Sequence, residues 1–185
     1  MNFSLESSEL LLYKFQEIKK EPSLLAIFDR DGILNADDGY TYDKNKLKLT
    51  SGAVETFTFL ANRSIEIAVA TNQSGISRKL YTRRQMEDFN FKLWNELRSR
   101  TGVSFTLLAA CPHSPDFGCS CRKPKSGLLE AIIKFYKIPK KRVAFFGDQL
   151  TDYEAGQNIE LDSFQVQSCN LKTTVKDWVQ TFDFN

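Results

Sequence analysis

The sequence predicts an α/β fold in which a mainly parallel sheet lies between two layers of helices, a three-layer Rossmann-like arrangement. Short apolar runs alternate along the 185 residues with longer segments whose apolar residues recur at helical spacing. Strands separated by helices need crossover connections, and these favour parallel pairing. The first run, residues 24–28, is continuously apolar (LLAIF), as expected for a strand covered on both faces.

The individual elements follow from the same patterns. Thr82 and Gln85 form a capping-box pattern that opens a long helix reaching Arg100, and Ser51 is a candidate cap for an earlier helix. The predicted strands are residues 24–28, 65–70, 105–110, 143–146 and 162–166. The other predicted helices are residues 128–136, 153–158 and 175–181.

Residues 1–22 lie outside this alternation. Leu10, Leu11, Leu12 and Phe15 predict a helix that docks on the body of the protein. We therefore divide the chain into an N-terminal helical extension, residues 1–22, and one α/β domain, residues 23–185.

Composition narrows the class of protein. A hydrophobic content of 42% and a charged content of 26% are ordinary for a globular domain, and a formal charge of +2 does not predict nucleic-acid binding. The first twenty residues lack the basic start and apolar run of a signal peptide. No apolar stretch approaches the roughly 18 residues of a membrane span. We expect a cytoplasmic monomer that does not bind membranes.

Polar motifs follow each of the first four strands. DRDG follows the first strand, TNQSG the second, a cysteine-rich segment the third and GDQLTD the fourth. In parallel sheets ligands bind beyond the carboxyl ends of the strands, so all four motifs are expected at one edge. This co-location predicts a single active site.

The first motif places Asp29 and Asp31 on a turn that Gly32 allows to curve sharply. Two carboxylates held together favour Mg²⁺, which prefers oxygen ligands. One can attack phosphorus while the other protonates the leaving alkoxide. Taken alone, such a pair is more often two solvated turn acids.

The other motifs supply hydrogen-bond donors, a further metal-binding carboxylate and positive charges that can bind a phosphate. Residues 71–75 offer hydroxyls, amides and backbone N–H groups for phosphate oxygens, although they also suit a simple strand-ending turn. Asp148 can complete a metal site, with Asp152 nearby as a further acid or a helix cap. Lys123 and Lys125 can neutralise a transferring phosphoryl group.

The cysteine-rich segment predicts a zinc loop. Cys111, His113, Cys119 and Cys121 make a closed set of three thiolates and one imidazole, which suits structural Zn²⁺ and leaves no position for a catalytic water. Disulfide pairing is the alternative, and Cys169 stands apart from the cluster. A folded zinc loop would aim Arg122 and Lys123 at the phosphate.

Together these residues resemble the haloacid-dehalogenase (HAD) superfamily, whose four motifs match the DRDG segment with Asp29 and Asp31, then Thr71, Lys123 and Gly147-Asp148, in that order. The resemblance implies a HAD-like fold without a large cap domain. It implies that Asp29 is the nucleophile and that Asp31 is the general acid and then the base. Mg²⁺ would be bound by the Asp29 side chain, the Asp31 carbonyl and Asp148.

The zinc loop narrows the resemblance to two groups, heptose-1,7-bisphosphate 7-phosphatases and histidinol-phosphate phosphatases. The DDGY and TNQSGI segments favour the first, whereas the five-residue gap in the zinc loop also suits the second, and Gln149 stands where the heptose enzymes often carry a basic residue. The resemblance implies the following phosphate- and substrate-binding residues: Asp37, Asp38, Gly39, Tyr40, Thr71, Asn72, Gln73, Ser74, Arg122 and Lys123.

The leading hypothesis is thus a Mg²⁺-dependent phosphatase that removes the 7-phosphate of a heptose bisphosphate in surface-sugar (lipopolysaccharide) synthesis. The alternatives are a phosphatase of histidinol phosphate or of another sugar phosphate, a nucleic-acid-end phosphatase, and a zinc-stabilised binding module without activity.

Overall fold

The computed structural model describes residues 10–18, 22–61, 63 and 65–182, and here six strands form one sheet in the order β1-β4-β3-β2-β5-β6. The strands are β1 (Leu11–Lys14), β2 (Leu24–Phe28), β3 (Ile65–Asn72), β4 (Leu107–Cys111), β5 (Val143–Gly147) and β6 (Asp162–Gln165). All neighbouring pairs are parallel except β1 and β4, which are antiparallel.

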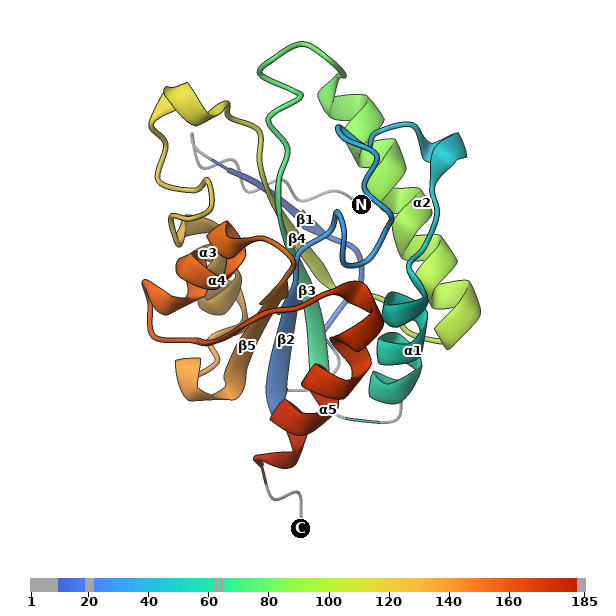
Figure 1. Ribbon diagram of the computed structural model, residues 1–185, viewed down its shortest axis with the longest axis vertical. Coiled ribbons are helices and arrows are strands. Elements are labelled where there is room, and N and C mark those ends of the chain that lie inside the picture. Colours follow the sequence, from blue (N-terminus) through green and yellow to red (C-terminus); the bar gives the residue numbers. More distant parts are fainter. Residues whose placement is uncertain (1–9, 19–21, 62, 64, 183–185) are drawn as a thin grey trace.

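The helices cover both faces of this sheet (Figure 1). They are α1 (Ser51–Leu60), α2 (Arg83–Thr101), α3 (Gly127–Tyr136), α4 (Leu150–Gln157) and α5 (Leu171–Gln180). Buried residues of α1, α2 and α5 belong to one core, and those of α3 and α4 belong to the other. The predicted three-layer α/β arrangement is therefore confirmed.

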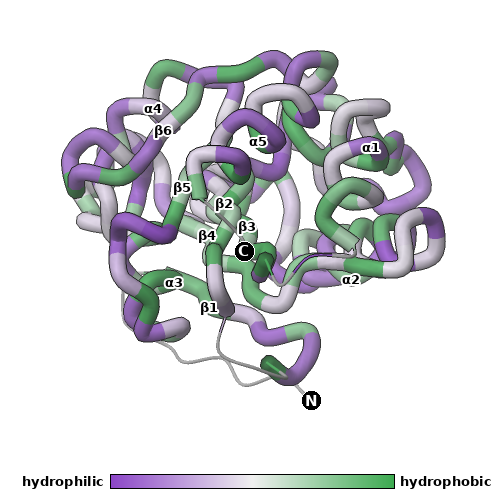
Figure 2. Tube along the Cα trace, turned by 90° about the horizontal axis from the view of Figure 1, so that it is seen from below, coloured by the Kyte–Doolittle hydropathy of each residue, from purple (hydrophilic) through white to green (hydrophobic). Residues whose placement is uncertain are grey.

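Strand β2 shows how the sequence builds the two cores. Leu24, Ala26 and Phe28 face the core under α1, α2 and α5. Leu25 and Ile27 face the opposite core, because successive side chains of a strand point to opposite faces. Figure 2, which looks roughly along the strands, shows hydrophobic strands at the centre and, around them, helices that mix hydrophobic and hydrophilic residues.

The prediction of a helix in the N-terminal segment is wrong where the structure describes it. Leu11–Lys14 form strand β1, which pairs with residues 107–110 of β4. Leu12 and Tyr13 are both buried but belong to opposite cores, which requires the alternation of a strand. Residues 1–9 lie outside the described part of the chain, and the division at residue 22 stays a prediction.

The other elements lie where the sequence predicts them, with shifted ends, but Thr50 and not Ser51 caps α1, since Thr50 Oγ1 accepts from the Ala53 N–H (3.1 Å). The capping box at α2 is present: the Thr82 N–H donates to Gln85 Oε1 (2.8 Å), and the Gln85 N–H donates to Thr82 Oγ1 (3.2 Å). Strand β3 extends to Asn72, two residues beyond the prediction, because residues 71–72 continue the pairing with β4. Helix α5 begins earlier, at Leu171, after a short 3-10 turn.

Between consecutive strands the described residues form only single helices and short 3-10 turns, so this part of the chain contains no separate cap domain. None of the helices among the described residues is both long enough and apolar enough to span a membrane.

Candidate active site

A cavity of about 380 Å³ opens at the carboxyl ends of the parallel strands. The residues that follow β2, β3, β4 and β5 meet there, at the upper end of the sheet in Figure 1. Its lining includes Asp29, Asp31, Asp37, Gly39, Tyr40, Thr71, Asn72, Gln73, Ser74, Arg122, Lys123, Asp148 and Asp152. Of the site residues named from sequence for the phosphate, the substrate and magnesium, Asp38 alone is not part of this lining.

Asp29 lies at the floor of the cavity, directly after β2. Its backbone N–H donates to the Phe146 carbonyl (2.9 Å), which ties it to β5. Lys123 Nζ donates to Asp29 Oδ1 (2.6 Å) and to the Ala70 carbonyl (3.0 Å). It also lies 2.6 Å from Asp152 Oδ1. One buried ammonium therefore joins two buried carboxylates.

Burial shifts the pKa values of Asp29 and Lys123. Burial raises the pKa of Asp29 to about 8, with Asp152 and Asp31 adding to the rise and Lys123 opposing it. Burial disfavours the Lys123 ammonium, yet Asp29 and Asp152 hold the pKa of Lys123 above its ordinary value. The carboxylates outnumber the lysine, so the site favours a further positive charge.

Asp148 supplies a third carboxylate beside this pair. Ligand oxygens of Asp29, Asp148 and Asp152 lie within 4.8 Å of one another. Gln149 Nε2 donates to Asp148 Oδ2 (2.6 Å), whereas buried Asp148 Oδ1 has no hydrogen-bond partner. An orphaned carboxylate oxygen among other carboxylates suits a hard divalent cation, so these residues fit Mg²⁺.

Asp31 is held from its buried side. Arg30 Nη2 donates to both carboxylate oxygens (2.9 Å each), and Asn35 Nδ2 donates to Oδ1 (2.9 Å). Gln73 Nε2 donates to Oδ2 (3.0 Å). The Asp31 side chain stays 19% exposed and lines the cavity, so its orientation is fixed where a substrate can reach it.

The segment after β3 builds one wall of the cavity. Buried Gln73 donates to Thr71 Oγ1 (2.8 Å) as well as to Asp31, and Tyr81 Oη donates to Gln73 Oε1 (2.7 Å). Asn72 exchanges two 3.2 Å hydrogen bonds with the Lys123 backbone. Gln73 and Asn72 therefore hold neighbouring groups in place in addition to lining the cavity.

The loop after the first turn forms the outer rim. Asp37 Oδ1 accepts from the Gly39 N–H (2.9 Å) and from Thr41 Oγ1 (3.2 Å), which closes a compact turn. Tyr40 is 43% exposed at the rim and adopts a φ of 50°. A mouth of this kind presents polar groups and one aromatic face to a ligand.

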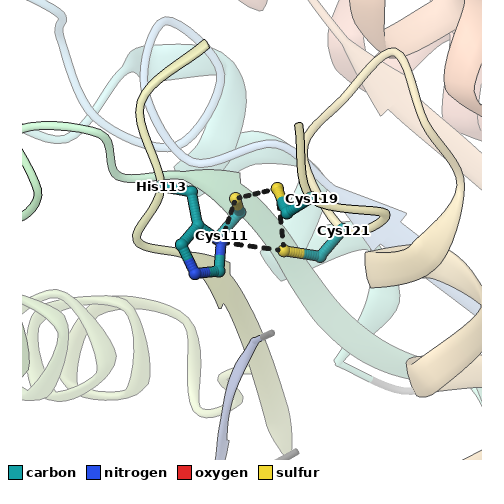
Figure 3. A group of neighbouring side chains, drawn as sticks. All are labelled: Cys111, His113, Cys119 and Cys121. Atoms are coloured by element: carbon teal, nitrogen blue, oxygen red, sulfur yellow. Dashed lines mark hydrogen bonds between the residues drawn. The ribbon is translucent and has the colours of Figure 1, made fainter. Parts of the chain in front are cut away.

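The predicted zinc ligands converge from the end of β4 and the loop that follows it (Figure 3). The Sγ atoms of Cys111 and Cys119 lie 3.7 Å apart and those of Cys119 and Cys121 3.5 Å apart. His113 Nδ1 lies 3.6 Å from Cys111 Sγ and 3.4 Å from Cys121 Sγ. Tetrahedral Zn²⁺ with ordinary bond lengths would separate S–S pairs by about 3.8 Å and S–N pairs by about 3.6 Å. The donor set fits zinc.

The predicted disulfide alternative is not supported, because all of these cysteines are free in the structure. The loop also places its neighbours. Arg122 lines the cavity and donates from Nη1 to the His113 carbonyl (3.3 Å). Lys125 donates to the carbonyls of Gly118 (3.1 Å) and Cys119 (2.6 Å), so it holds the loop, and it is not among the residues that line the cavity.

The sequence analysis misses two features of buried charges, the ion pair of Asp152 with Lys123 and the burial of Arg30. Asp152 is expected near the site or as a helix cap, and it does both: it pairs with Lys123 and accepts from the Gln149 N–H (3.0 Å). Its position four residues after Asp148, in the first turn of α4, is the available signal. Arg30 stands as the variable residue between two aspartates, and nothing in its sequence context marks it as fully buried.

The family match covers most of the chain: the family model of haloacid dehalogenase-like hydrolases aligns with residues 5–160. The chain belongs to the haloacid dehalogenase-like hydrolases. The predicted superfamily is thereby confirmed, and with it the HAD-like fold.

Two curated relatives of this hydrolase share a name. The D-glycero-β-D-manno-heptose-1,7-bisphosphate 7-phosphatase of Pseudomonas putida is 40% identical over 132 residues, 71% of this chain and 75% of its own. Its namesake in Pseudomonas aeruginosa is 36% identical over 145 residues, 78% and 81% of the two chains.

A solved structure of a protein with the same kind of name is also similar to this chain. The D,D-heptose 1,7-bisphosphate phosphatase of Bordetella bronchiseptica, complexed with magnesium and phosphate, superposes with a TM-score of 0.74 at 30% identity, covering 83% of this chain and 86% of its own. The predicted phosphatase activity of this hydrolase is confirmed by the family and by these relatives.

Proposed function

We propose that this phosphatase removes the 7-phosphate of D-glycero-D-manno-heptose 1,7-bisphosphate through an aspartyl-phosphate on Asp29. The observation that carries the chemistry is the cluster at the strand ends, where Lys123 pairs with Asp29 and Asp152 and the Asp148 carboxylate lies close to both. The likeness to the heptose bisphosphate phosphatases supports the substrate. The proposed location is the cytoplasm, and the proposed partner is this small phosphorylated sugar alone.

Each step has a residue in place. An Asp29 oxygen bonds to phosphorus while the bond to the sugar oxygen breaks, and Asp31 gives its proton to that oxygen. Water then attacks phosphorus, Asp31 takes its proton, and inorganic phosphate leaves with Asp29 restored. Lys123 and Thr71 border the cavity beside Asp29 and would hold the phosphoryl oxygens.

Magnesium is the proposed catalytic metal. The Asp29 side chain, the Asp31 carbonyl and Asp148 would hold it, with Asp152 as an additional nearby carboxylate. When bound it would neutralise the crowded carboxylates and polarise the phosphate. Asp148 Oδ1, which is buried and unpaired, is the atom that most needs such a partner.

Zinc is proposed as a structural metal in the loop that carries Arg122. Cys111, His113, Cys119 and Cys121 use every position of a tetrahedral site, so no position is left for a reacting water. The metal would fix the backbone on which Arg122 and Lys123 are mounted. Arg122, with its planar fork, suits the second phosphate of a bisphosphate.

The decisive experiment is to compare phosphate release from the heptose bisphosphate, histidinol phosphate and a panel of sugar monophosphates. We expect the highest kcat/KM for the heptose bisphosphate, with Asp29→Asn folded but inactive. A preference for histidinol phosphate would overturn the substrate and leave the mechanism standing. Substantial turnover by Asp29→Asn would overturn the assignment of the nucleophile.

Two other hypotheses have lost support. An inactive binding module would be expected to lack a carboxylate or the lysine of the site, and here all of them line one cavity. The formal charge of +2 and the zinc loop argue against a nucleic-acid-end phosphatase, so we expect no release of phosphate from a 3′-phosphorylated oligonucleotide.

A further inference from the structure

Arg30 is a buried charge that the proposed mechanism does not use. It lies between Asp29 and Asp31, yet its side chain is fully buried, and it is absent from the lining of the cavity. A substrate in the cavity therefore cannot touch it. Burying a guanidinium is costly unless its charge and its donors are matched, so its partners indicate what it does.

Those partners join three parts of the site. Arg30 grips the Asp31 carboxylate with Nη2 (2.9 Å to each oxygen) and Nε (3.2 Å to Oδ1). Nη2 also donates to the carbonyl of Thr41 (2.7 Å), at the end of the rim loop 37–41. Nη1 donates to Oδ1 of buried Asn90 on α2 (2.9 Å).

Helix α2 anchors the far side of this arrangement. The Phe89 ring lies under the guanidinium, 4.7 Å from Arg30 Cζ to the ring centroid. Phe89 and Asn90 are themselves buried, so the guanidinium is held between a rigid helix and the carboxylate it grips. A planar fork in this setting restricts rotation of Asp31 more than a single point charge would.

We propose that Arg30 is a positioning residue that orients Asp31 for proton transfer and links that orientation to the rim loop. It acts through Asp31 and does not touch the substrate. The inference rests on the proposed role of Asp31 as general acid and base. In the step concerned, the proton passes from the Asp31 carboxyl to the sugar oxygen as the Asp29–phosphorus bond forms and the phosphorus–oxygen bond to the sugar breaks.

The leaving group provides the test, because only a poor leaving group needs the proton. The heptose bisphosphate, or the best sugar phosphate of the panel if the heptose is not turned over, releases an alkoxide. p-Nitrophenyl phosphate releases a stable phenolate that needs little protonation. For Arg30→Lys, kcat/KM should fall by about 10- to 100-fold on the sugar phosphate, a part of the roughly 10²–10⁴ that general acid catalysis typically contributes. On p-nitrophenyl phosphate it should fall by less than about 3-fold, because little of that contribution is needed there.

Two further variants distinguish a failure of this inference from a failure of the proposed role of Asp31. Asp31→Asn gives the full loss of the acid and should show a larger leaving-group difference of the same kind. The double variant Arg30→Lys with Asp31→Asn should match Asp31→Asn alone, because Arg30 acts through the residue already changed. If Asp31→Asn itself shows no leaving-group difference, the proposed acid is wrong, and the inference about Arg30 falls with it.

Folding is controlled in parallel. Arg84→Lys makes the same substitution at a surface arginine of α2, which pairs with Asp88 (3.1 Å), and should leave both activities unchanged. Thermal unfolding of each variant shows whether it is folded at the assay temperature. For Arg30→Lys, the loss of kcat/KM on the sugar phosphate is compared with the loss on p-nitrophenyl phosphate in the same protein preparation, so that partial unfolding would affect both equally. Equal losses on both substrates for folded Arg30→Lys, where Asp31→Asn discriminates between them, would overturn the inference.

Discussion

Gly32 shows how closely single residues are packed around the proposed magnesium site. It adopts a φ of +80°, and a Cβ there would lie 2.6 Å from Asp148 Oδ2. Gly32→Ala should therefore displace Asp148. We expect the Mg²⁺ concentration for half-maximal activity to rise about 10- to 100-fold, as is typical when the support of a metal ligand is disturbed. The measurement is a Mg²⁺ titration of phosphate release.

Gly102→Ala is the matched control. Gly102 has a φ of +79° at the end of α2, and a Cβ added there would meet no atom within 4 Å. Both variants bear the backbone cost of a left-handed residue, about 1–2 kcal/mol, but only Gly32→Ala disturbs a carboxylate. Equal Mg²⁺ requirements in the two variants would contradict the proposed role of Asp148.

Asp152 has a structural role that can be measured apart from activity. It pairs with Lys123 in a setting where both side chains are nearly inaccessible. Asp152→Asn removes one charge of this buried group. The free energy of unfolding should fall by about 1–3 kcal/mol, the usual cost of losing a buried hydrogen bond to a charged group, because Lys123 keeps Asp29 as a partner. Urea denaturation measures it.

Asp88→Asn provides the surface comparison. Asp88 pairs with Arg84 on the outside of α2, and exposed pairs contribute only about 0–1 kcal/mol. A loss in Asp152→Asn no greater than in Asp88→Asn would show that Lys123 does not depend on Asp152.

Among the site residues, the sequence predicts those whose place depends only on which strand they follow. Asp29, Asp31 and Asp148 follow strands, so the rule that sites form at strand ends is enough to bring them together. Arg30 cannot be predicted in the same way. Its burial depends on Phe89 and Asn90 of α2, which are distant in the chain, and no local pattern in a D-x-D turn records that contact.

The zinc loop is the element whose proposed metal can be removed selectively. Cys119→Ser takes one ligand from the set, so we expect the bound zinc to fall from about one per chain to a small fraction. The loop then loses its anchor, and KM should rise because Arg122 is mounted on it. Metal analysis of the folded protein and steady-state kinetics measure the two effects.

Cys169→Ser is the control for this change, because Cys169 is exposed and lies outside the cluster. It should keep both zinc and activity. Zinc-free, folded Cys119→Ser with unchanged KM would contradict the positional role of the loop, whatever its effect on stability.

Strand β1 is the element for which the sequence-based prediction is wrong, and the reason is physical. A strand of four residues is too short to be distinguished from a helix by periodicity. The segment forms a strand because it pairs with β4, which lies far along the chain. Edge pairing of this kind is a tertiary contact, and the apolar residues that bury the strand would equally suit a docked helix.

The contribution of β1 to stability is testable. Leu12 is buried against the α3 and α4 core, so Leu12→Ala should lower the free energy of unfolding by about 2–5 kcal/mol. Lys14, in the same strand, is partly exposed, and Lys14→Ala should change it by no more than about 0.5 kcal/mol. Similar small losses in both variants would show that β1 adds little to the core.

At the scale of the whole molecule, the architecture is predictable because crossover connections and strand ends follow general rules that need only the order of elements. The consequence is a site assembled from segments that are far apart in sequence: Asp29 follows β2, Thr71 lies at the end of β3, Lys123 follows β4 and Asp148 follows β5. A ligand that contacts all of them must bind the folded chain and not the unfolded one. Binding at this edge should therefore stabilise the entire sheet.

Beryllofluoride with Mg²⁺, which attaches to an aspartate as a phosphoryl group would, tests this coupling. At roughly 100 times its dissociation constant a ligand stabilises the folded state by about 2.7 kcal/mol. For a chain of this size that corresponds to a rise in Tm of roughly 5–10 °C. Asp29→Asn should show almost none of this rise, since the attachment point is gone while the fold remains. An equal rise in both proteins would place the binding away from Asp29 and contradict the proposed phosphorylation site.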